Sequence, residues 1–327
     1  MMKTPIVYTL ISSEKDYFLE ELWVSLYSLR QFHPEVTVNV LVDESTKKYM
    51  ERFPKLCDMI TNIVVVPVPG NYNAKQRSRV IKTTVRNVID GAYLFIDTDT
   101  VICKPLDDID NLTCDMAAVP DGHLPLSECM FPPTNSVNKI FKTDVSDSKY
   151  WFNSGVMFVA DNEQTRKFYK RWNENWTYSC FEKGQSQDQP ALLATDKEFG
   201  YIISELPGIY NAQVAMSLKY FADAAIVHWW HMSFIENQDY SPFFSLQIYK
   251  DVKTAKGLTA DIKELIMHCK QSFVSPTMPV GKEHIYFLFS PAGKIFNRIY
   301  KEGGAASFLM NKCAAILEKI HKYTKKK

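Results

Sequence analysis

Two aspartates two positions apart form the strongest chemical signal in this sequence. Asp97 and Asp99 follow the apolar run Ala92–Ile96, within the segment LFIDTDTVICKPL. Side chains at positions i and i+2 of an extended chain share a face, so both carboxylates can approach one cation. Carboxylates and phosphate oxygens form the hard oxygen shell that Mg²⁺ or Mn²⁺ prefers. The pair alone also fits an acidic turn that caps the next element, but its place after a strand favours a metal site.

The residues before this pair predict the elements that must position it. The apolar runs that indicate strands are Pro5–Ile11, Thr37–Asp43, Asn62–Val68 and Ala92–Ile96. Helical patterns separate these runs at residues 16–32, 45–57 and 73–89, with Ser45 as the expected cap of the second helix and Gly91 as the end of the third. This alternation is typical of an α/β domain with a mainly parallel central sheet flanked by helices, in which ligands bind beyond the carboxyl ends of the strands.

The second half of the chain predicts less regular structure. Met116–Val119 and Val156–Val159 indicate strands, and Glu163–Trp176 indicates a helix. Residues 120–150 show no clear periodicity, so we expect a long surface loop or lid there. Helical pieces follow from about residue 240.

Charge is uneven along the chain, whose 327 residues carry a net charge of +1 and therefore do not suggest a nucleic-acid-binding protein. Residues 294–327 combine nine Lys or Arg and two Glu with apolar side chains. We expect a main domain at residues 1–240 and a helical, basic C-terminal extension at residues 241–327. The extension could contact the acceptor or an anionic membrane surface, or it could be a helix packed on the main domain.

The cysteines and the N-terminal residues bear on the compartment. The chain has seven cysteines, an odd number, and no Cys-x-x-Cys pair, which favours a reducing environment. The first residues, MMKTPIVYTLISSEKDYF, do not resemble a signal peptide. We expect a cytoplasmic protein that can contact the inner face of the membrane.

Four segments in a particular order carry a resemblance to a known family. They are the basic helix at residues 73–89, the strand with Asp97 and Asp99, Phe152–Met157 (FNSGVM), and Gln187–Gln189 followed by a histidine in AIVHWWH. With this order, residues 5–234 resemble the GT-A fold glycosyltransferases of family 8, the group that includes glycogenin and the bacterial lipopolysaccharide galactosyl- and glucosyltransferases.

The resemblance implies a role for each matching residue. The implied ligands of Mn²⁺ (or Mg²⁺) are Asp97, Asp99 and His228. The residues expected at the donor are Lys82, Arg79, Asp97, Asn153, Ser154 and Asp188. Asp188 would also accept hydrogen bonds from sugar hydroxyls, and Gln189 would lie near the anomeric carbon, on the face opposite the leaving group.

Some positions depart from the family pattern or allow a second interpretation. The family usually follows its late histidine with a glycine and a lysine that touch the diphosphate, whereas this chain continues with Trp229, Trp230 and His231. His231 could replace His228 as a ligand, and either tryptophan could stack on a sugar or lie in the core. The basic helix face that carries Arg79, Lys82 and Arg86 could simply be solvated. Asp43 could bind a ribose or cap a helix, and Asn153–Gly155 could be only a turn.

The function that we expect is metal-dependent transfer of a hexose from a UDP-sugar to a saccharide or glycolipid acceptor, in surface polysaccharide or lipopolysaccharide synthesis. The resemblance implies retention of anomeric configuration, and no carboxylate stands at the Gln189 position to form a covalent intermediate. The alternative is a non-catalytic module of the same fold that binds a nucleotide-sugar or a glycan. A sugar-phosphate nucleotidyltransferase is disfavoured because ISSEKDYF, which follows the first strand, contains no glycine.

Overall fold

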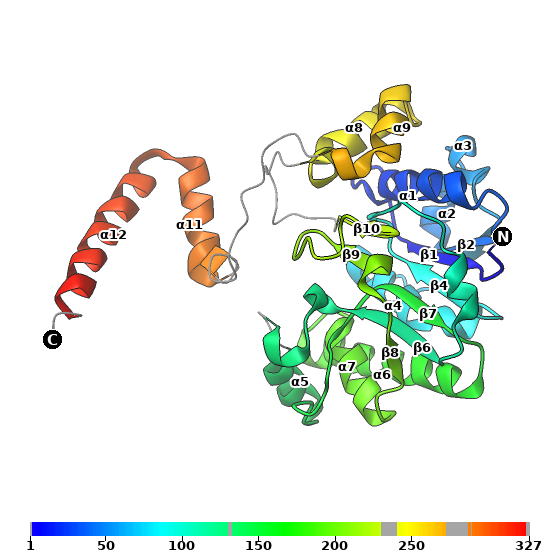
Figure 1. The fold of residues 1–327 in the computed structure, drawn as a ribbon, viewed down its shortest axis with the longest axis horizontal. Helices are drawn as coiled ribbons and strands as arrows, with labels where there is room; N and C mark the ends of the chain where they lie inside the picture. Colours follow the sequence, from blue (N-terminus) through cyan, green and yellow to red (C-terminus); the bar gives the residue numbers. More distant parts are fainter. Residues whose placement is uncertain (1, 130–132, 230–240, 273–286, 289, 325–327) are drawn as a thin grey trace. The chain divides into compact units, whose positions relative to one another are not determined.

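The computed structural model describes residues 2–129, 133–229, 241–272, 287–288 and 290–324 (Figure 1). The chain forms two compact units, Met1–Pro276 and Thr277–Lys327. Within the second unit lie helices α11 (Pro291–Glu302) and α12 (Gly304–Thr324). Among the described residues, no helix has both the length and the apolar character needed to cross a bilayer.

The first unit is built on a seven-stranded sheet. Its strands, in spatial order, are β3 (Asn62–Val65), β2 (Val38–Val42), β1 (Ile6–Leu10), β4 (Tyr93–Ile96), β7 (Phe152–Val159), β6 (Met116–Pro120) and β8 (Ile203–Glu205). The pairs β3–β2, β2–β1, β1–β4 and β6–β8 are parallel. Strand β7 is antiparallel to both β4 and β6. The predicted α/β class, with a mainly parallel sheet flanked by helices and with C-terminal helices, is confirmed.

Two hydrophobic clusters cover the opposite faces of this sheet. Side chains alternate along a strand, so Ile6 and Tyr8 of β1 join one cluster and Val7 joins the other. The first cluster includes helices α1 (Phe18–Phe32), α8 (Leu246–Ala255) and α9 (Ala260–Met267). The second includes α4 (Ala74–Val88), α6 (Glu163–Lys183) and α7 (Gln189–Glu198). Because α8 and α9 contact α1, the first compact unit continues past residue 240.

A second, three-stranded sheet joins distant parts of the first unit. Its strands are β5 (Thr100–Ile102), β10 (Ile226–His228) and β9 (Ala212–Gln213), with β10 in the middle. β10 runs antiparallel to β5, and His228 lies opposite Thr100. The backbone N–H of Trp229 donates to the carbonyl of Asp99 at 2.9 Å. This pairing places a late strand of the chain beside the end of β4.

Three expectations about the predicted helices are wrong. The second helix is split into α2 (Glu44–Met50) and α3 (Pro54–Cys57), since a proline disfavours the helical conformation in the residue before it. The side chain of Asp43, not that of Ser45, caps α2 by accepting from the backbone N–H of Thr46. The C-terminal cap of α4 is Ile89, and not Gly91.

The segment at residues 120–150 also differs from the expected loop. It contains α5 (Thr134–Phe141), which is too short to show a clear helical repeat. The first unit also contains short 3₁₀ helices: η1 (Asp107–Asn111), η2 (Asp121–His123), η3 (Leu126–Glu128), η4 (Gly208–Asn211), η5 (Pro242–Phe244) and η6 (Cys269–Gln271). The start of η2 and the end of η4 border the site described below.

Candidate active site

Asp97 and Asp99 lie in the turn between β4 and β5, at the carboxyl end of β4. The backbone N–H of Asp97 donates to the carbonyl of Gly155 on β7 at 2.7 Å. The Thr100 hydroxyl donates to the carbonyl of Asp97 at 2.9 Å, which holds the turn. Both aspartates therefore stand where an α/β sheet offers ligands access to its strand ends.

His228 completes a group of possible metal ligands with these two aspartates. Its Nε2 lies 3.1 Å from Oδ1 of Asp99. One ligand atom from each of Asp97, Asp99 and His228 can be chosen so that all three lie within 4.8 Å of one another. We call these three residues the metal cluster. The sequence predicted that the three come together, whereas His231 and Trp230 lie outside the described residues.

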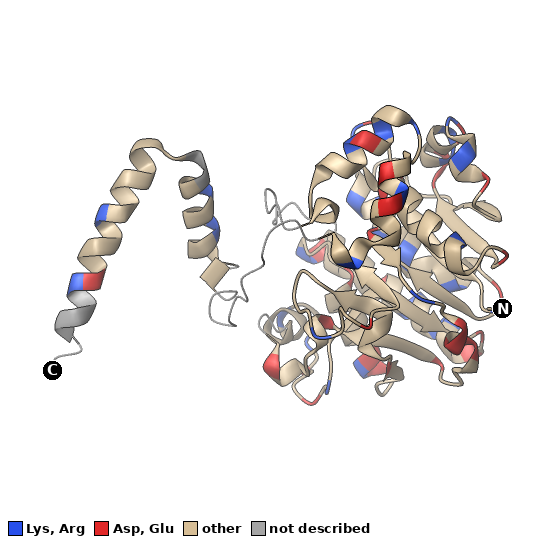
Figure 2. Cartoon of the chain, turned by 45° about the horizontal axis from the view of Figure 1, so that its top comes forward, with Lys and Arg blue, Asp and Glu red and all other residues tan. Residues whose placement is uncertain are grey.

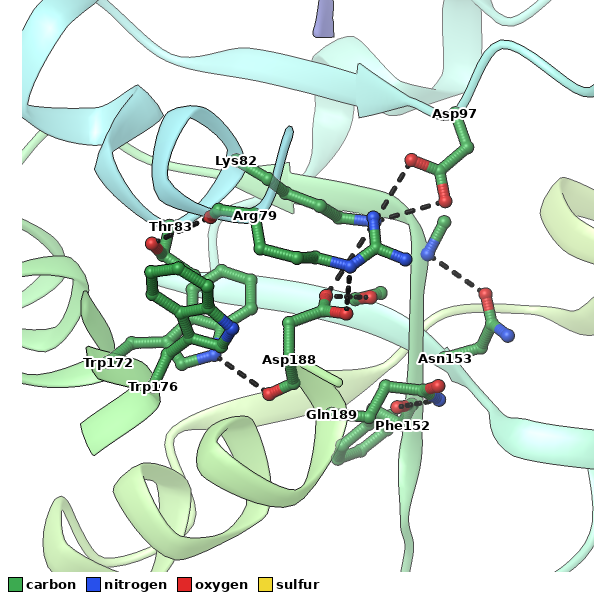
Figure 3. A network of polar contacts seen from close by, with 12 residues as sticks. Arg79, Lys82, Thr83, Asp97, Phe152, Asn153, Trp172, Trp176, Asp188 and Gln189 are labelled. Carbon is green, nitrogen blue, oxygen red and sulfur yellow. Dashed lines mark hydrogen bonds and ion pairs between the residues drawn. The ribbon is translucent and has the colours of Figure 1, made fainter. Parts of the chain in front are cut away.

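A second group of residues, the ion-pair network, lies beside the metal cluster and consists of Arg79, Lys82, Ser154 and Asp188. Figure 3 shows the Arg79 and Lys82 side chains pointing toward the carboxylate of Asp188. Nε of Arg79 lies 2.9 Å from Oδ1 of Asp188. Nζ of Lys82 lies 3.8 Å from Oδ2 of Asp188 and donates to the two oxygens of Asp97 at 2.9 and 3.0 Å. The Ser154 hydroxyl donates to Oδ2 of Asp188 at 2.8 Å. Lys82 thus links the network to the metal cluster.

The basic face of α4 is not a solvated surface. The Lys82 side chain is only 3% exposed, and Arg86, one turn further along, is fully buried. The guanidinium of Arg86 donates to the carbonyls of Gly91 and Ile89 and pairs with Asp161, so it holds the end of α4. Arg79 and Lys82 of this face instead reach the carboxylates of Asp188 and Asp97.

Opposing effects set the protonation of the carboxylates. Burial alone would raise the pKa of Asp188, but the charges of Arg79 and Lys82 and the Ser154 hydrogen bond outweigh it and lower this pKa to about 2. Burial raises the pKa of Asp97, and the charge of Lys82 only partly opposes this shift. Asp188 is therefore a carboxylate at neutral pH.

Helix α6 supplies the support beneath Asp188. Indole Nε1 of Trp172 donates to the Asp188 carbonyl at 3.2 Å (Figure 3). Nε1 of Trp176 donates to the Ser186 carbonyl, also at 3.2 Å. Both tryptophans are fully buried. Gly184 ends α6 with a φ of 70°, a conformation that glycine adopts without strain. The segment leading into α7 is therefore held by buried side chains.

Gln189 and Asn153 meet at a carboxylate that the sequence analysis did not identify. Nδ2 of Asn153 donates to Oδ1 of Asp121 at 2.9 Å, and Nε2 of Gln189 donates to the same oxygen at 3.1 Å. Nε2 of Gln189 also donates to the Phe152 carbonyl at 3.2 Å, which fixes the orientation of the amide. Burial raises the pKa of Asp121, and the two amide hydrogen bonds oppose this shift. Asp121 follows β6 as Asp97 follows β4, a signal that could have found it.

The Asn153–Gly155 segment is part of strand β7, and not merely a turn before it. A Cβ added at Gly155 would lie 2.4 Å from Cε1 of His228 and 2.8 Å from Oδ1 of Asn153. Real Cβ atoms do not approach this closely, so glycine is what lets the His228 ring and the Asn153 amide both lie against this strand.

The structure decides between the two interpretations offered for Trp229 and for Asp43. Trp229 is 1% exposed and stacks on Phe243 at a ring-centroid distance of 5.0 Å, so it is a core residue. Asp43 caps α2 and pairs with Arg77, as its helix-capping interpretation predicted.

Comparison with solved structures returns matches of low sequence identity. The apo form of mouse xyloside xylosyltransferase 1 matches at 13% identity and a TM-score of 0.46, over 69% of this chain and 97% of that one. The glycosyltransferase GlyE of Streptococcus pneumoniae matches at 14% and 0.48, over 85% of this chain and 67% of that one. The galactosyltransferase LgtC in complex with donor and acceptor sugar analogs matches at 15% and 0.47, over 84% and 98%. No curated protein sequence matches the chain.

A family-level comparison covers most of the first unit. The sequence profile of glycosyl transferase family 8 matches residues 9–233, more than half of the chain. The matched range contains β4, α7 and β10, the elements that carry the metal cluster and Asp188. The family and the class of enzyme predicted from the sequence are both confirmed. The chain belongs to glycosyl transferase family 8 and is a glycosyltransferase.

Proposed function

We propose that this enzyme moves a hexose from a UDP-sugar to a glycan or lipid-linked acceptor, with a divalent cation at the metal cluster and with retention of anomeric configuration. One observation carries the proposal: two carboxylates and an imidazole converge at a strand end, directly beside a buried, ion-paired carboxylate. The first group suits a metal-bound diphosphate, and the second suits a sugar. The wider role, synthesis of surface polysaccharide or lipopolysaccharide, belongs to the same proposal.

The residues of the metal cluster fit a divalent cation. Carboxylate oxygens and a neutral imidazole nitrogen are accepted ligands of Mn²⁺, and Mg²⁺ shares the preference for oxygen. Asp97, Asp99 and His228 would hold the cation, which supplies Lewis-acid stabilisation of the departing nucleoside diphosphate. Arg79 and Lys82 add positive charge on the neighbouring side.

The ion-pair network and Gln189 have proposed roles toward the sugar. Asp188 stays ionised, so its oxygens accept hydrogen bonds from sugar hydroxyls, and Ser154 and Asn153 line the same side. Because Asp121 and Phe152 hold the Gln189 amide by its nitrogen, the carbonyl oxygen Oε1 is the end that remains to face the anomeric carbon. An amide there stabilises an oxocarbenium-like transition state, and the acceptor then attacks on the leaving-group face.

Release of UDP by the purified chain tests this function. A panel of UDP-hexoses, each with Mn²⁺, Mg²⁺ or a chelator and with a mixture of saccharide acceptors, identifies the donor and the cation. A thermal-shift screen of UDP-, GDP- and dTDP-sugars narrows the panel, because a ligand that binds only the folded state raises the unfolding temperature. We expect UDP release that requires a divalent cation. Donor binding without UDP release, for every donor and acceptor, would contradict the proposal.

One observation favours a second candidate, a nucleotide-sugar or glycan binding module without catalysis. The ammonium of Lys82 contacts both oxygens of Asp97, so it can supply part of the positive charge that a metal would bring. Such a module would be stabilised by a UDP-sugar equally well with Mn²⁺ and with a chelator. The same thermal-shift series therefore separates the two candidates.

We also propose that helices α11 and α12 bind an anionic membrane surface, on its cytoplasmic face. Both helices expose large apolar side chains: Ile295, Tyr300, Phe308, Leu309, Ile316 and Leu317. The same two helices carry basic residues, drawn as blue segments in Figure 2. These residues include Lys294, Arg298, Lys312 and Lys319. Apolar and cationic groups together favour a negatively charged lipid surface.

Co-sedimentation with vesicles tests the membrane proposal. The full chain should pellet with phosphatidylserine-containing vesicles, and less with pure phosphatidylcholine vesicles or at high salt. A chain lacking residues 291–327 should remain in the supernatant. Equal pelleting of the two chains would remove the proposal without affecting the enzymatic one.

A further inference from the structure

The metal cluster is backed by a chain of buried hydrogen bonds whose direction can be worked out. It starts at the backbone N–H of Gly155, which donates to Oδ1 of Asn153 at 2.9 Å. Because a backbone N–H can only donate, the Asn153 atom facing it must be the amide oxygen. The other end of the amide, Nδ2, then donates to Asp121, as the acceptor chemistry of a carboxylate requires.

The next bond in this chain reaches Asn211, at the end of η4. Its amide approaches Oδ1 of Asn153 at 3.0 Å and must therefore present Nδ2. Oδ1 of Asn211 is left facing Nδ1 of His228 at 2.9 Å. Asn153, Asn211 and His228 are all at least nine-tenths buried, so water is poorly placed to replace these partners.

The tautomer of His228 follows from these directions. An amide oxygen only accepts, so Nδ1 of His228 must carry a hydrogen. In a neutral imidazole the lone pair is then on Nε2, the nitrogen that lies 3.1 Å from Oδ1 of Asp99. A divalent cation held between this lone pair and the carboxylate oxygen would satisfy both atoms.

We propose that Asn211 is a positioning residue that fixes the Nδ1–H tautomer of His228 and so aims the Nε2 lone pair into the metal cluster. This inference rests on the proposed metal-dependent function. Neutral histidine in water populates both tautomers, so a protein that selects one in advance binds metal more tightly. Loss of such an outer partner typically weakens metal binding about 10- to 100-fold.

The fold explains why residue 211 is in this position. Asn211 directly precedes β9, and the next residues, Ala212 and Gln213, pair in parallel with Val227 and His228 of β10. The pairing of β10 with β5 brings His228 to Asp99, and the pairing of β9 with β10 sets the Asn211 amide against the other side of the ring. Gly155 leaves room for the His228 ring and the Asn153 amide beside strand β7.

The tautomer can be read directly from the metal-free full chain. Nitrogen-15 NMR of labelled histidine distinguishes a protonated from an unprotonated Nδ1, at a pH above the ordinary histidine range. The His228 signals are assigned by their loss in His228→Gln. We expect a protonated Nδ1 in the unchanged protein, whether or not Nε2 shares a proton with Asp99. A protonated Nε2 with a bare Nδ1 would overturn the inference, and this arm needs no variant at Asn211.

Asn211→Ala tests the role of the amide. We expect the His228 signals to shift toward the other tautomer and the affinity for Mn²⁺, followed by electron paramagnetic resonance of free Mn²⁺, to fall about 10- to 100-fold. The matched control is Asn175→Ala, because Asn175 is a buried asparagine that hydrogen-bonds Thr195 and Glu198 away from the site. It should leave both readouts unchanged.

The outcomes separate this inference from the proposed function. An Asn211→Ala protein with the Nδ1–H tautomer and undiminished Mn²⁺ affinity would overturn the positioning role. UDP release could still require Mn²⁺ in that case, and the enzymatic proposal would stand. Absence of any cation-dependent UDP release in the unchanged chain would instead remove the function on which the inference rests.

Discussion

The metal cluster and the ion-pair network lie side by side but differ in their balance of charge. The cluster joins two carboxylates to one imidazole, whereas the network sets the single carboxylate of Asp188 against Arg79 and Lys82. Burial raises the pKa of Asp97 in the cluster. In the network the same effect of burial is outweighed by the two cations, and the pKa of Asp188 falls to about 2.

This difference suggests that the two groups have different roles in binding the donor. Carboxylates gathered around an imidazole gain stability when a ligand brings positive charge, so they suit a metal and the diphosphate bound to it. The network already has two cations for its one carboxylate, so it needs no further cation and instead offers fixed hydrogen-bonding groups, which suit neutral hydroxyls. We expect the two groups to act on different parts of one donor molecule, and the predictions below test that separation.

The largest effect should come from the metal cluster. Asp97→Asn removes a charged ligand, and we expect UDP release to fall about 1000-fold, since electrostatic stabilisation of a leaving group is a large contribution to catalysis. Binding of UDP alone, measured calorimetrically with Mn²⁺, should weaken as well. Asp58→Asn, at an exposed surface position, is the control. Near-normal turnover in Asp97→Asn would show that the cluster does not hold the catalytic cation.

Asp188→Asn should sharpen the comparison, because it removes a charge from the network alone. Hydrogen bonds to charged groups contribute about 1.5–3 kcal/mol, so we expect kcat/KM to fall about 10- to 100-fold. The affinity for UDP without its sugar should stay the same or increase, since Arg79 and Lys82 lose a competing carboxylate. If the affinities for UDP and for the UDP-sugar fall equally, the two groups do not bind different parts of the donor.

Gly155→Ala probes the contact between β7 and the metal cluster. The added methyl group would press on His228 and Asn153, so the imidazole must move, and Mn²⁺ affinity should fall about tenfold. Gly70→Ala is the matched control, because a Cβ there meets nothing within 4 Å. Unchanged Mn²⁺ binding in Gly155→Ala would mean that His228 is not held in the position described.

The smallest effect concerns Asp196, a buried carboxylate within α7. Burial raises the pKa of Asp196 from 3.8 to about 7, and only backbone N–H groups of Ile203 and Ile202 oppose the shift. The folded chain therefore binds this proton more tightly than the unfolded chain does. The free energy of unfolding should fall as pH rises from about 4 to about 7 and then level off.

Asp196→Asn should remove the fall in the free energy of unfolding that the unchanged chain shows as pH rises. Above about pH 7 we expect the variant to unfold at a temperature at least about 2 °C higher than the unchanged chain. This difference in unfolding temperature should disappear toward about pH 4. Thermal unfolding followed by circular dichroism at a series of pH values measures it. A difference in unfolding temperature that does not change with pH would show that Asp196 stays protonated or solvated. Asp188, with its lowered pKa, should contribute in the opposite direction, and only at strongly acidic pH.

The sequence predicted the parts of the site that depend on local pattern. Apolar runs located β1, β2 and β4 to within two residues at each end, and therefore placed Asp97 and Asp99 at a strand end. The helix that carries Arg79 and Lys82 was also predicted. Whether those side chains were solvated or buried was left open, because burial depends on which element packs against the helix.

Long-range pairing set the limit of prediction. The register of β10 against β5, which brings His228 to Asp99, is not encoded by the periodicity of either short strand. The resemblance supplied His228, but neither pattern nor resemblance pointed to Asn211, whose amide reaches His228 only through the pairing of β9 with β10. Asp121 was missed although it follows a predicted strand, because the segment after that strand shows no periodicity that would bring it to the site.

Anomalous diffraction from a crystal grown with Mn²⁺ and UDP tests the central claim most directly. The account predicts one strong manganese peak within coordination distance of Asp97, Asp99 and His228, with the diphosphate oxygens of UDP completing its shell. A manganese peak elsewhere, or UDP bound with its phosphates on Arg79 and Lys82 and no metal at the two aspartates, would contradict it.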